Sequence, residues 1–147
     1  MGFLSVMRIA GSALTAQRLR MDVTASNIAN AEATSTPTGG PYRRESVVFD
    51  PIPTPARGGY RLLTARGAPP TSGVQVRAIV ADSSEPRLVY DPGHPDADAE
   101  GYVRFPNVDL VTEMTNMLSA SRAYEANITV INVAKNMAQR AIDLGRV

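Results

Sequence analysis

Apolar residues recur at alternating intervals of three and four positions near both ends of the 147-residue chain. This spacing keeps an apolar side chain on the same helix face at every turn, which is the pattern of a coiled-coil seam. It predicts a first helix from about Phe3 to Ala33 and a second helix that begins after Pro106 and ends near Gly145. At about 1.5 Å per residue, these helices are roughly 45 and 55 Å long.

Each predicted helix has its own seam. In the first helix the seam residues are Leu4, Met7, Gly11, Leu14, Arg18, Met21, Ala25 and Ile28. In the second helix they are Leu110, Met114, Met117, Ser121, Tyr124, Ile128, Ile131, Lys135, Ala138 and Ile142. Gly11 is a weak position, because glycine in a helix interior costs up to about 1 kcal/mol, and the close approach of a neighbour would explain it.

The second helix carries a further apolar stripe beside its seam. The members of this stripe are Val111, Leu118, Val130, Val133, Ala134, Met137, Ala141 and Leu144. A helix that is apolar on more than one side has to be covered on more than one side. The two helices can pair only with each other, so their outer stripes predict assembly with other chains.

The region between the helices has a different character. All eleven prolines lie between Pro37 and Pro106, and proline is excluded from helix interiors. Short runs rich in Val, Tyr, Phe and Ile predict strands at Arg43–Phe49, Tyr60–Thr64, Gly73–Ala81, Arg87–Tyr90 and Gly101–Phe105. The prolines at positions 51, 53 and 55 exclude a central strand there, because proline donates no ladder hydrogen bond.

These patterns together predict an α+β fold with three regions. Residues 1–35 and 107–147 form two long terminal helices, packed as an antiparallel, coiled-coil-like pair. Residues 36–106 form a small β-rich, Pro/Gly-rich middle. Asn107 or Asp109 is the expected N-cap of the second helix, and Gly145 suits its C-cap.

Composition and charge exclude several classes of function. The formal net charge is +1 and is spread evenly, whereas a nucleic-acid-binding protein usually carries a basic patch. The chain has no cysteine, which excludes disulfides, thiolate nucleophiles and cysteine-ligated metals. No apolar run is long enough to span a bilayer, and the N-terminus lacks the basic region of a cleaved signal peptide. We therefore expect no nucleic-acid binding and no direct membrane insertion.

Candidate catalytic and metal-binding residues are few. His94 is the only histidine and lies in a turn of Pro, Gly and Asp, without the nucleophile and orienting group that catalysis needs. Asp96, Asp98 and Glu100 imitate the first half of a calcium loop, but Asn107 stands where that loop requires a bidentate Glu. The sequence predicts no catalytic residue, no cofactor and no metal site.

Two asparagines three positions apart, Asn27 and Asn30, stand near the end of the first helix. One interpretation is a fraying helix end, where Asn is tolerated. The other is that both side chains bond to a packed neighbour and set its register, because a buried Asn without partners costs about 1–3 kcal/mol. The local chemistry favours neither interpretation.

The strings Ser12–Gln17 and Asp22–Ala31 resemble the N-terminal signature of the bacterial flagellar rod, hook and hook-associated axial proteins. Three further strings resemble the matching C-terminal signature of these proteins. They are Asn107–Asp109, Glu113–Met114 and Ser121–Asn127. The resemblance therefore covers both predicted helices.

A third string, Tyr90–Asp98 followed by Gly101–Val103, is similar to the proximal-rod members of this family. The resemblance implies a structural subunit of the flagellar basal-body rod, the drive shaft that crosses the periplasm from the membrane ring toward the distal rod and hook. It implies that the terminal helices form the inner tube of a helical assembly. It also implies export by the flagellar type III apparatus without a cleaved signal peptide.

The implied partners are copies of the same chain, other proximal and distal rod subunits, and the membrane-ring and rod-adaptor proteins at the base. The predicted assembly interface combines seam residues with polar register contacts from the two signatures. Its members are Leu4, Met7, Leu14, Met21, Asn27, Ile28, Asn30, Leu110, Met114, Met117, Arg122, Tyr124, Asn127, Ile128, Ile131, Ala138 and Ile142.

Three alternatives stay open at this point. The first is another axial protein, such as a neighbouring rod subunit or a hook component. The second is a coiled-coil adaptor or secreted effector with soluble partners. The third is an enzyme, which no constellation of residues supports.

Overall fold

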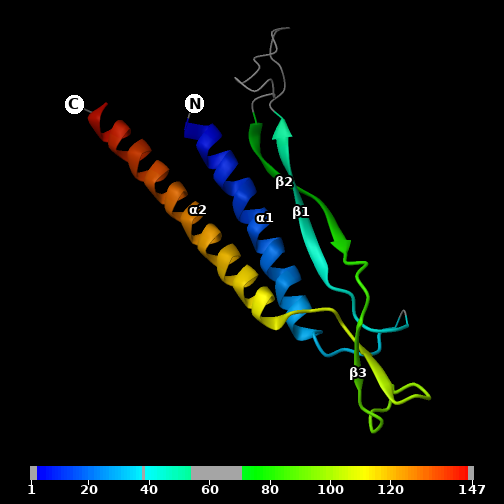
Figure 1. Ribbon diagram of the computed structural model, residues 1–147. Helices are drawn as coiled ribbons and strands as arrows, with labels where there is room; N and C mark the ends of the chain where they lie inside the picture. The colour runs from blue at the N-terminus through cyan, green and yellow to red at the C-terminus, as the bar shows by residue number, and fades with distance from the viewer. Residues whose placement is uncertain (1–2, 38, 54–70, 146–147) are drawn as a thin grey trace.

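The described part of the chain forms two long antiparallel helices and two small sheets (Figure 1). The structure is a computed structural model that describes residues 3–37, 39–53 and 71–145. Helix α1 spans Phe3–Ala29 and helix α2 spans Leu110–Leu144. The predicted α+β class with two terminal helices is confirmed.

Helix α1 lies between α2 and the larger sheet (Figure 1). It ends at Ala29, earlier than the periodicity predicts, because the chain then enters a series of tight turns. In these turns the Ala33 N–H donates to the Asn30 carbonyl, and Gly39 and Gly40 both adopt a positive φ that favours glycine.

The larger sheet is an antiparallel ribbon of strands β1 (Glu45–Pro53) and β2 (Thr71–Ala81). Its register runs from Glu45 opposite Ala81 to Pro53 opposite Thr71, with two irregularities along β1. Pro51 and Pro53 are tolerated in this ribbon because each strand of a two-stranded sheet is an edge strand.

The smaller sheet pairs β3 (Arg87–Tyr90) with β4 (Tyr102–Phe105) in antiparallel register. The turn between these strands brings Gly101 against the Tyr90 ring, where an added Cβ would lie 2.9 Å from a ring carbon. Four of the five predicted strands are therefore present, Arg87–Tyr90 with its predicted bounds and the other three with shifted bounds. The fifth, Tyr60–Thr64, lies outside the described residues.

Two acidic side chains of the sequence that imitates a calcium loop, Asp96 and Asp98, form hydrogen bonds within the protein. The Asp98 carboxylate accepts the N–H groups of Glu100 and Tyr102, and the Asp96 carboxylate accepts the Thr34 hydroxyl. The His94 ring packs edge-on against Phe105, and its Nδ1 accepts the Asp96 N–H. The Asp98 carboxylate and the His94 ring therefore stabilise the turn, whereas the Asp96 carboxylate joins it to the segment after α1.

The core is small and lies mostly along α1 and α2, with one member in the smaller sheet. Among the described residues, the buried apolar side chains are Ala10, Ala16, Val23, Val103, Ala120 and Ala134. The ribbon approaches α1 closely at Gly73, where an added Cβ would lie 2.5 Å from Ser12 Oγ. That hydroxyl accepts the Val74 N–H, so one hydrogen bond joins β2 directly to the helix.

Helix α2 has well-defined ends. Asp109 is its N-cap, with the carboxylate accepting the Val111 N–H at 3.0 Å and the Thr112 hydroxyl at 2.7 Å. Gly145 is its C-cap and donates its N–H to the carbonyls of the last turn. Within the described residues, neither helix combines the length and apolar character needed to cross a membrane.

The cap at Asp109 predicts a pH dependence for α2. Hydrogen bonds from the Thr112 hydroxyl and the Val111 N–H lower the pKa of Asp109 from its usual 3.8. The folded-state pKa is therefore below the unfolded one, so the cap stabilises the fold above about pH 4 and this contribution is lost as the pH falls further. Asp109→Asn should lower the thermal midpoint at pH 7, and the gap to the wild type should close in acid.

The control for this experiment is Asp143→Asn, which removes an exposed carboxylate from the opposite end of α2. It should not lower the midpoint at pH 7, because a negative charge near a helix C-terminus is unfavourable. Circular dichroism melts between pH 7 and pH 3 would measure both variants. A constant gap between Asp109→Asn and the wild type across this range would refute the role of the cap.

Candidate assembly interface

A buried polar cluster ties the base of the helical hairpin together, and Asn27 lies at its centre. The side chain of Asn27 is 0% exposed. Its Nδ2 donates to the Glu45 carbonyl at 2.8 Å and to Glu113 Oε2 at 3.0 Å. Its Oδ1 accepts the Tyr42 hydroxyl at 3.0 Å and the Glu45 N–H at 2.9 Å. Two donors and two acceptors are the full capacity of an amide side chain, so α1, α2 and the start of β1 meet at one saturated residue.

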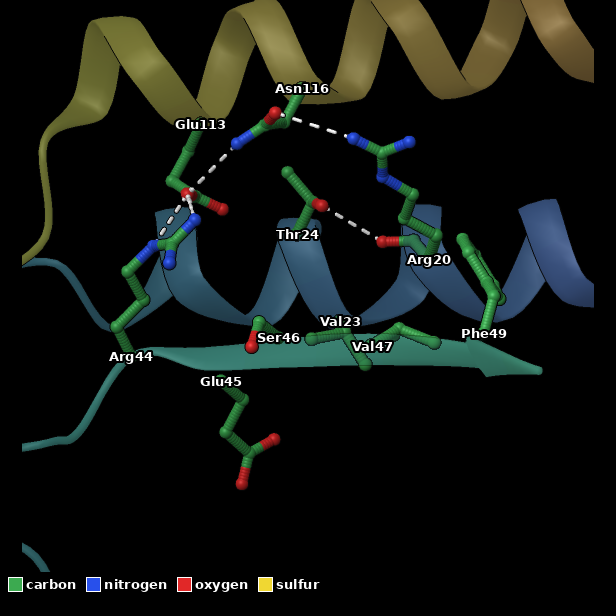
Figure 2. A pocket seen from close by; sticks show the side chains of 10 residues that line it. All are labelled: Arg20, Val23, Thr24, Arg44, Glu45, Ser46, Val47, Phe49, Glu113 and Asn116. Carbon is green, nitrogen blue, oxygen red and sulfur yellow. Dashed lines mark hydrogen bonds and ion pairs between the residues drawn. The ribbon is translucent and has the colours of Figure 1, made fainter. Parts of the chain in front are cut away.

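Glu113 is the second buried member of the cluster, with 1% of its surface exposed. Arg44, from the segment before β1, places both Nε and Nη2 at 2.8 Å from Glu113 Oε1. Asn116 donates to the same carboxylate from one turn further along α2 (Figure 2). A buried carboxylate without a partner is strongly destabilising, so the Arg44 guanidinium is what allows Glu113 to sit here.

The chemistry of this cluster is structural. Both Glu113 oxygens accept hydrogen bonds from side chains that are themselves held in place, so the carboxylate is not positioned to abstract a proton. A cavity of about 300 Å³ lies beside it, lined partly by Val23, Val47 and Phe49 (Figure 2). Within the described residues, no group of three or more potential metal ligands comes together.

The second candidate surface is the outside of α2. Among the described helices and strands, α2 packs against α1 alone. Large apolar side chains consequently stand in solvent along its whole length. They are Leu110, Val111, Met114, Leu118, Ile128, Val130, Val133, Met137, Ile142 and Leu144.

The structure separates the predicted interface residues into three groups. One member, Asn27, is completely buried inside the subunit. The half-buried members are Met7, Leu14, Met21, Ile28, Asn30, Met117, Tyr124, Asn127, Ile131 and Ala138. The exposed members are Leu4, Leu110, Met114, Arg122, Ile128 and Ile142. Only the exposed group, and the exposed parts of the half-buried group, are available to another chain in this conformation.

The asparagines of the two signatures have different environments. Asn27 is held by packed segments of its own chain, which matches the register interpretation within the subunit. Asn30 lies just beyond α1, and its Nδ2 donates to the Ser26 carbonyl at 2.9 Å. Asn127 likewise donates to the Ala123 carbonyl of its own helix at 2.7 Å. Asn30 and Asn127 therefore make local bonds, whereas Asn27 joins distant elements.

Sequence reasoning did not assign Glu113, Arg44 and Tyr42 to this cluster. Glu113 occupies the first turn of α2, where an acid is usually explained by the helix dipole. The one local feature that could have indicated a buried role for Glu113 was its position directly beside the seam residue Met114. Its partners Asn27 and Arg44 are 86 and 69 residues away in the sequence, so no local pattern could pair them.

Comparison with known proteins identifies the family. Residues 7–37 match the model for flagella basal body rod proteins, and residues 99–144 match the C-terminal model for flagellar basal body rod FlgEFG proteins. Flagellar basal-body rod protein FlgC of Escherichia coli O6:H1 is 46% identical over 146 residues, which cover 99% of this chain and all of the relative. The FlgC proteins of Borreliella burgdorferi and Bacillus subtilis are 48% and 41% identical, with at least 95% of each chain covered.

The chain belongs to the FlgC family of flagellar basal-body rod proteins. The resemblance drawn from the two signatures is confirmed. The two matched segments of this FlgC-family chain hold Asn27 and Glu113, whereas Tyr42 and Arg44 lie between these segments. The polar cluster thus joins the segments shared across rod proteins to the chain's own middle region.

The saturated bonding of Asn27 predicts that Asn27→Asp destabilises the fold by about 1–3 kcal/mol. The substitution removes both Nδ2 donors and faces a second carboxylate toward Glu113 Oε2, which lies 3.0 Å from Nδ2 in the native protein. Urea unfolding followed by circular dichroism would measure the loss. Asn30→Asp is the matched control and should cost less, because Asn30 bonds only within its own turn.

A second substitution tests whether the lost stability comes from the hydrogen bond between positions 27 and 113 or from a general disruption of the fold. Glu113→Gln in the Asn27→Asp background restores a donor between positions 27 and 113. The double variant should recover part of the lost stability in a double-mutant cycle. Equal stability of Asn27→Asp and Asn30→Asp would contradict the role given to the cluster.

Proposed function

We propose that this FlgC-family chain is a structural subunit of the proximal rod, in the drive shaft that transmits torque from the membrane ring toward the distal rod and hook. Its place would be the periplasm-spanning part of the basal body, reached by flagellar type III export. Its partners would be copies of itself, other rod subunits, and ring or adaptor proteins at the base.

The observation that carries this proposal is the uncovered apolar surface of α2. Ten large apolar side chains are exposed on a helix that packs against one other element among those described. Burying one such side chain fully contributes about 1.5–3 kcal/mol, and an exposed patch of this extent marks an interaction surface. Neighbouring helices of the same kind supply the matching cover.

A torque-bearing shaft also needs subunits that do not shear internally. Coiled-coil-like packing of α1 against α2 would support a stiff inner tube. The cluster around Asn27 and Glu113 holds the ribbon to this pair by directional bonds. An adaptor or effector loses support because the relatives are named as rod proteins. An enzyme loses support because the Glu113 carboxylate is engaged in structural bonds.

The direct experiment is to isolate basal bodies and determine whether the chain is part of them. A coiled-coil adaptor or secreted effector would be absent from washed basal bodies, whereas a rod subunit would remain after the outer components are stripped. Recovery of the chain only in soluble complexes would overturn the proposal.

Apolar contacts of α2 predict that Ile128→Asp or Ile131→Asp abolishes assembly while the exported monomer stays soluble. Ile128 is exposed and Ile131 is half-buried, so a carboxylate at either position would have to be desolvated in a packed tube. Motility and electron microscopy of basal bodies would measure the effect. Asn136→Asp, at an exposed polar position, is the control and should assemble. Normal rods in both Ile variants would contradict this prediction.

Gly11 offers an independent test of neighbour packing. A Cβ built at Gly11 meets nothing within 4 Å in the described subunit, so its own fold does not require glycine there. Gly11→Ala should therefore stabilise the isolated chain by about 1 kcal/mol in helix propensity. If a neighbour approaches this position in the tube, the same variant should assemble poorly. Normal assembly of Gly11→Ala would show that no neighbour contacts α1 closely at this turn.

A further inference from the structure

The cavity beside Glu113 has one guanidinium more than its buried carboxylate needs. Residues of α1, β1 and the first turns of α2 line this cavity of about 300 Å³. Arg44 pairs with Glu113, and Arg20 also lines the cavity but forms no ion pair within the described residues. Glu45 is the other acid of the lining, and Figure 2 shows its side chain on the far side of β1, away from the helices. Two cations therefore face one carboxylate, so one positive charge is left uncompensated.

A short chain of hydrogen bonds connects Arg20 to this carboxylate. Arg20 Nη2 donates to Asn116 Oδ1 at 3.4 Å, and Asn116 Nδ2 donates to Glu113 Oε1 at 3.3 Å. Figure 2 shows Arg44, Glu113, Asn116 and Arg20 in this order. A guanidinium carries five N–H donors, and the Arg20 side chain uses one of them, in a long bond, within the described residues. The Arg20 guanidinium is therefore positioned by α2 and keeps donors for a further group.

Arg20 differs in its burial from the other arginines of the two helices. Arg8, Arg18, Arg122 and Arg140 are exposed, whereas Arg20 is half-buried between the helices and β1. Water solvates an exposed guanidinium, which needs no counter-ion for that reason. A half-buried guanidinium has lost part of its water, and its attraction to an anion is less screened than at the open surface. An anion consequently gains more at Arg20 than at the exposed arginines.

The apolar part of the cavity indicates what kind of anion fits. Val23, Val47 and Phe49 line it together with Arg20. Inorganic phosphate would leave these apolar side chains in water, whereas an Asp or Glu side chain has a methylene stem to cover them and a carboxylate for the guanidinium. A cavity of about 150 Å³ takes one benzene-sized group, so this cavity has room for one acidic side chain, which is smaller than benzene, and for water beside it.

We propose that this cavity binds an acidic side chain of a neighbouring rod subunit, whose carboxylate pairs with Arg20. Planar guanidinium and carboxylate groups can form two parallel hydrogen bonds, which makes such a contact directional. The uncovered apolar surface of α2 supplies attraction without direction, so a charge pair at Arg20 fixes where the neighbour docks. This inference rests on the proposed rod function and specifies the chemistry of the group that the neighbour presents.

A carbodiimide can identify the group that reaches the cavity, because it joins an amine to a carboxylate that touches it, with loss of water. Arg20→Lys keeps the positive charge and places an amine at the cavity. Lys135 is the only lysine of the chain, so other cross-links are few and recognisable. Basal bodies that contain the variant would be treated with the reagent, and mass spectrometry would identify the peptide joined to position 20.

The expected product joins position 20 to an Asp or Glu of another subunit, with a yield roughly tenfold above that of Arg18→Lys, as expected for a preformed charge pair. Arg18 is exposed and points to another side of α1. Ser46→Lys places an amine at the β1 side of the cavity and should give the same acidic partner. Cross-links from position 20 to Glu113 of the same chain alone, or an equal yield from Arg18→Lys, would overturn the site.

Two neutral variants separate docking from folding. Arg44→Gln should lower the urea midpoint of the isolated chain, because it leaves Glu113 buried without its counter-ion. Arg20→Gln should leave this midpoint nearly unchanged but lower incorporation into basal bodies roughly tenfold or more, since hydrogen bonds to charged groups are the stronger ones. Normal incorporation of Arg20→Gln would overturn the site and leave the rod function standing. Absence of the wild-type chain from basal bodies would overturn the proposed function as well.

Discussion

The hydrogen bond between Asn27 and Glu113 is the contact on which the rest of the structure depends. It sets the two helices level at the base of the hairpin and, through the Glu45 backbone, fixes where β1 begins. Of the three largest fully buried side chains in the described part of the chain, two are these polar residues. A core made mostly of alanines does little to fix how the elements are positioned along one another, because alanine side chains are small. The saturated hydrogen bonds of the polar cluster fix this register, which large interlocking side chains fix in other folds.

The arrangement of layers explains why a FlgC-family subunit suits an assembly. Helix α1 is covered by α2 on one side and by the ribbon on another, whereas α2 is covered by α1 alone among the described elements. The chain thus covers α1 from two sides and leaves the outer side of α2 exposed. Neighbouring subunits can complete α2 without disturbing the internal bonds of Asn27, because those bonds are made entirely inside the subunit.

Local patterns predicted the elements of the fold well, for reasons that particular residues make clear. The strand Arg87–Tyr90 was predicted with its observed bounds, because its apolar run stands between proline and glycine turns. Helix α1 ended earlier than predicted, since periodicity continues into residues that the structure uses for turns. The seams were predicted from spacing alone. The structure leaves Leu110, Met114 and Ile128 exposed, because a two-helix hairpin covers only one side of α2.

Local patterns were enough to predict the two helices, the edge character of the proline-bearing strand and the rod-protein family, because periodicity, proline chemistry and signature strings are all local properties. What Asn27 bonds to, why Glu113 is buried, and that α2 is covered by α1 alone among the described elements became clear only from the folded chain. Each of these depends on residues that are far apart in the chain and meet only after the hairpin closes. A hydrogen bond such as that between Asn27 and Glu113 has no trace in the spacing of either helix, because its strength comes from burial and geometry that the folded chain alone provides.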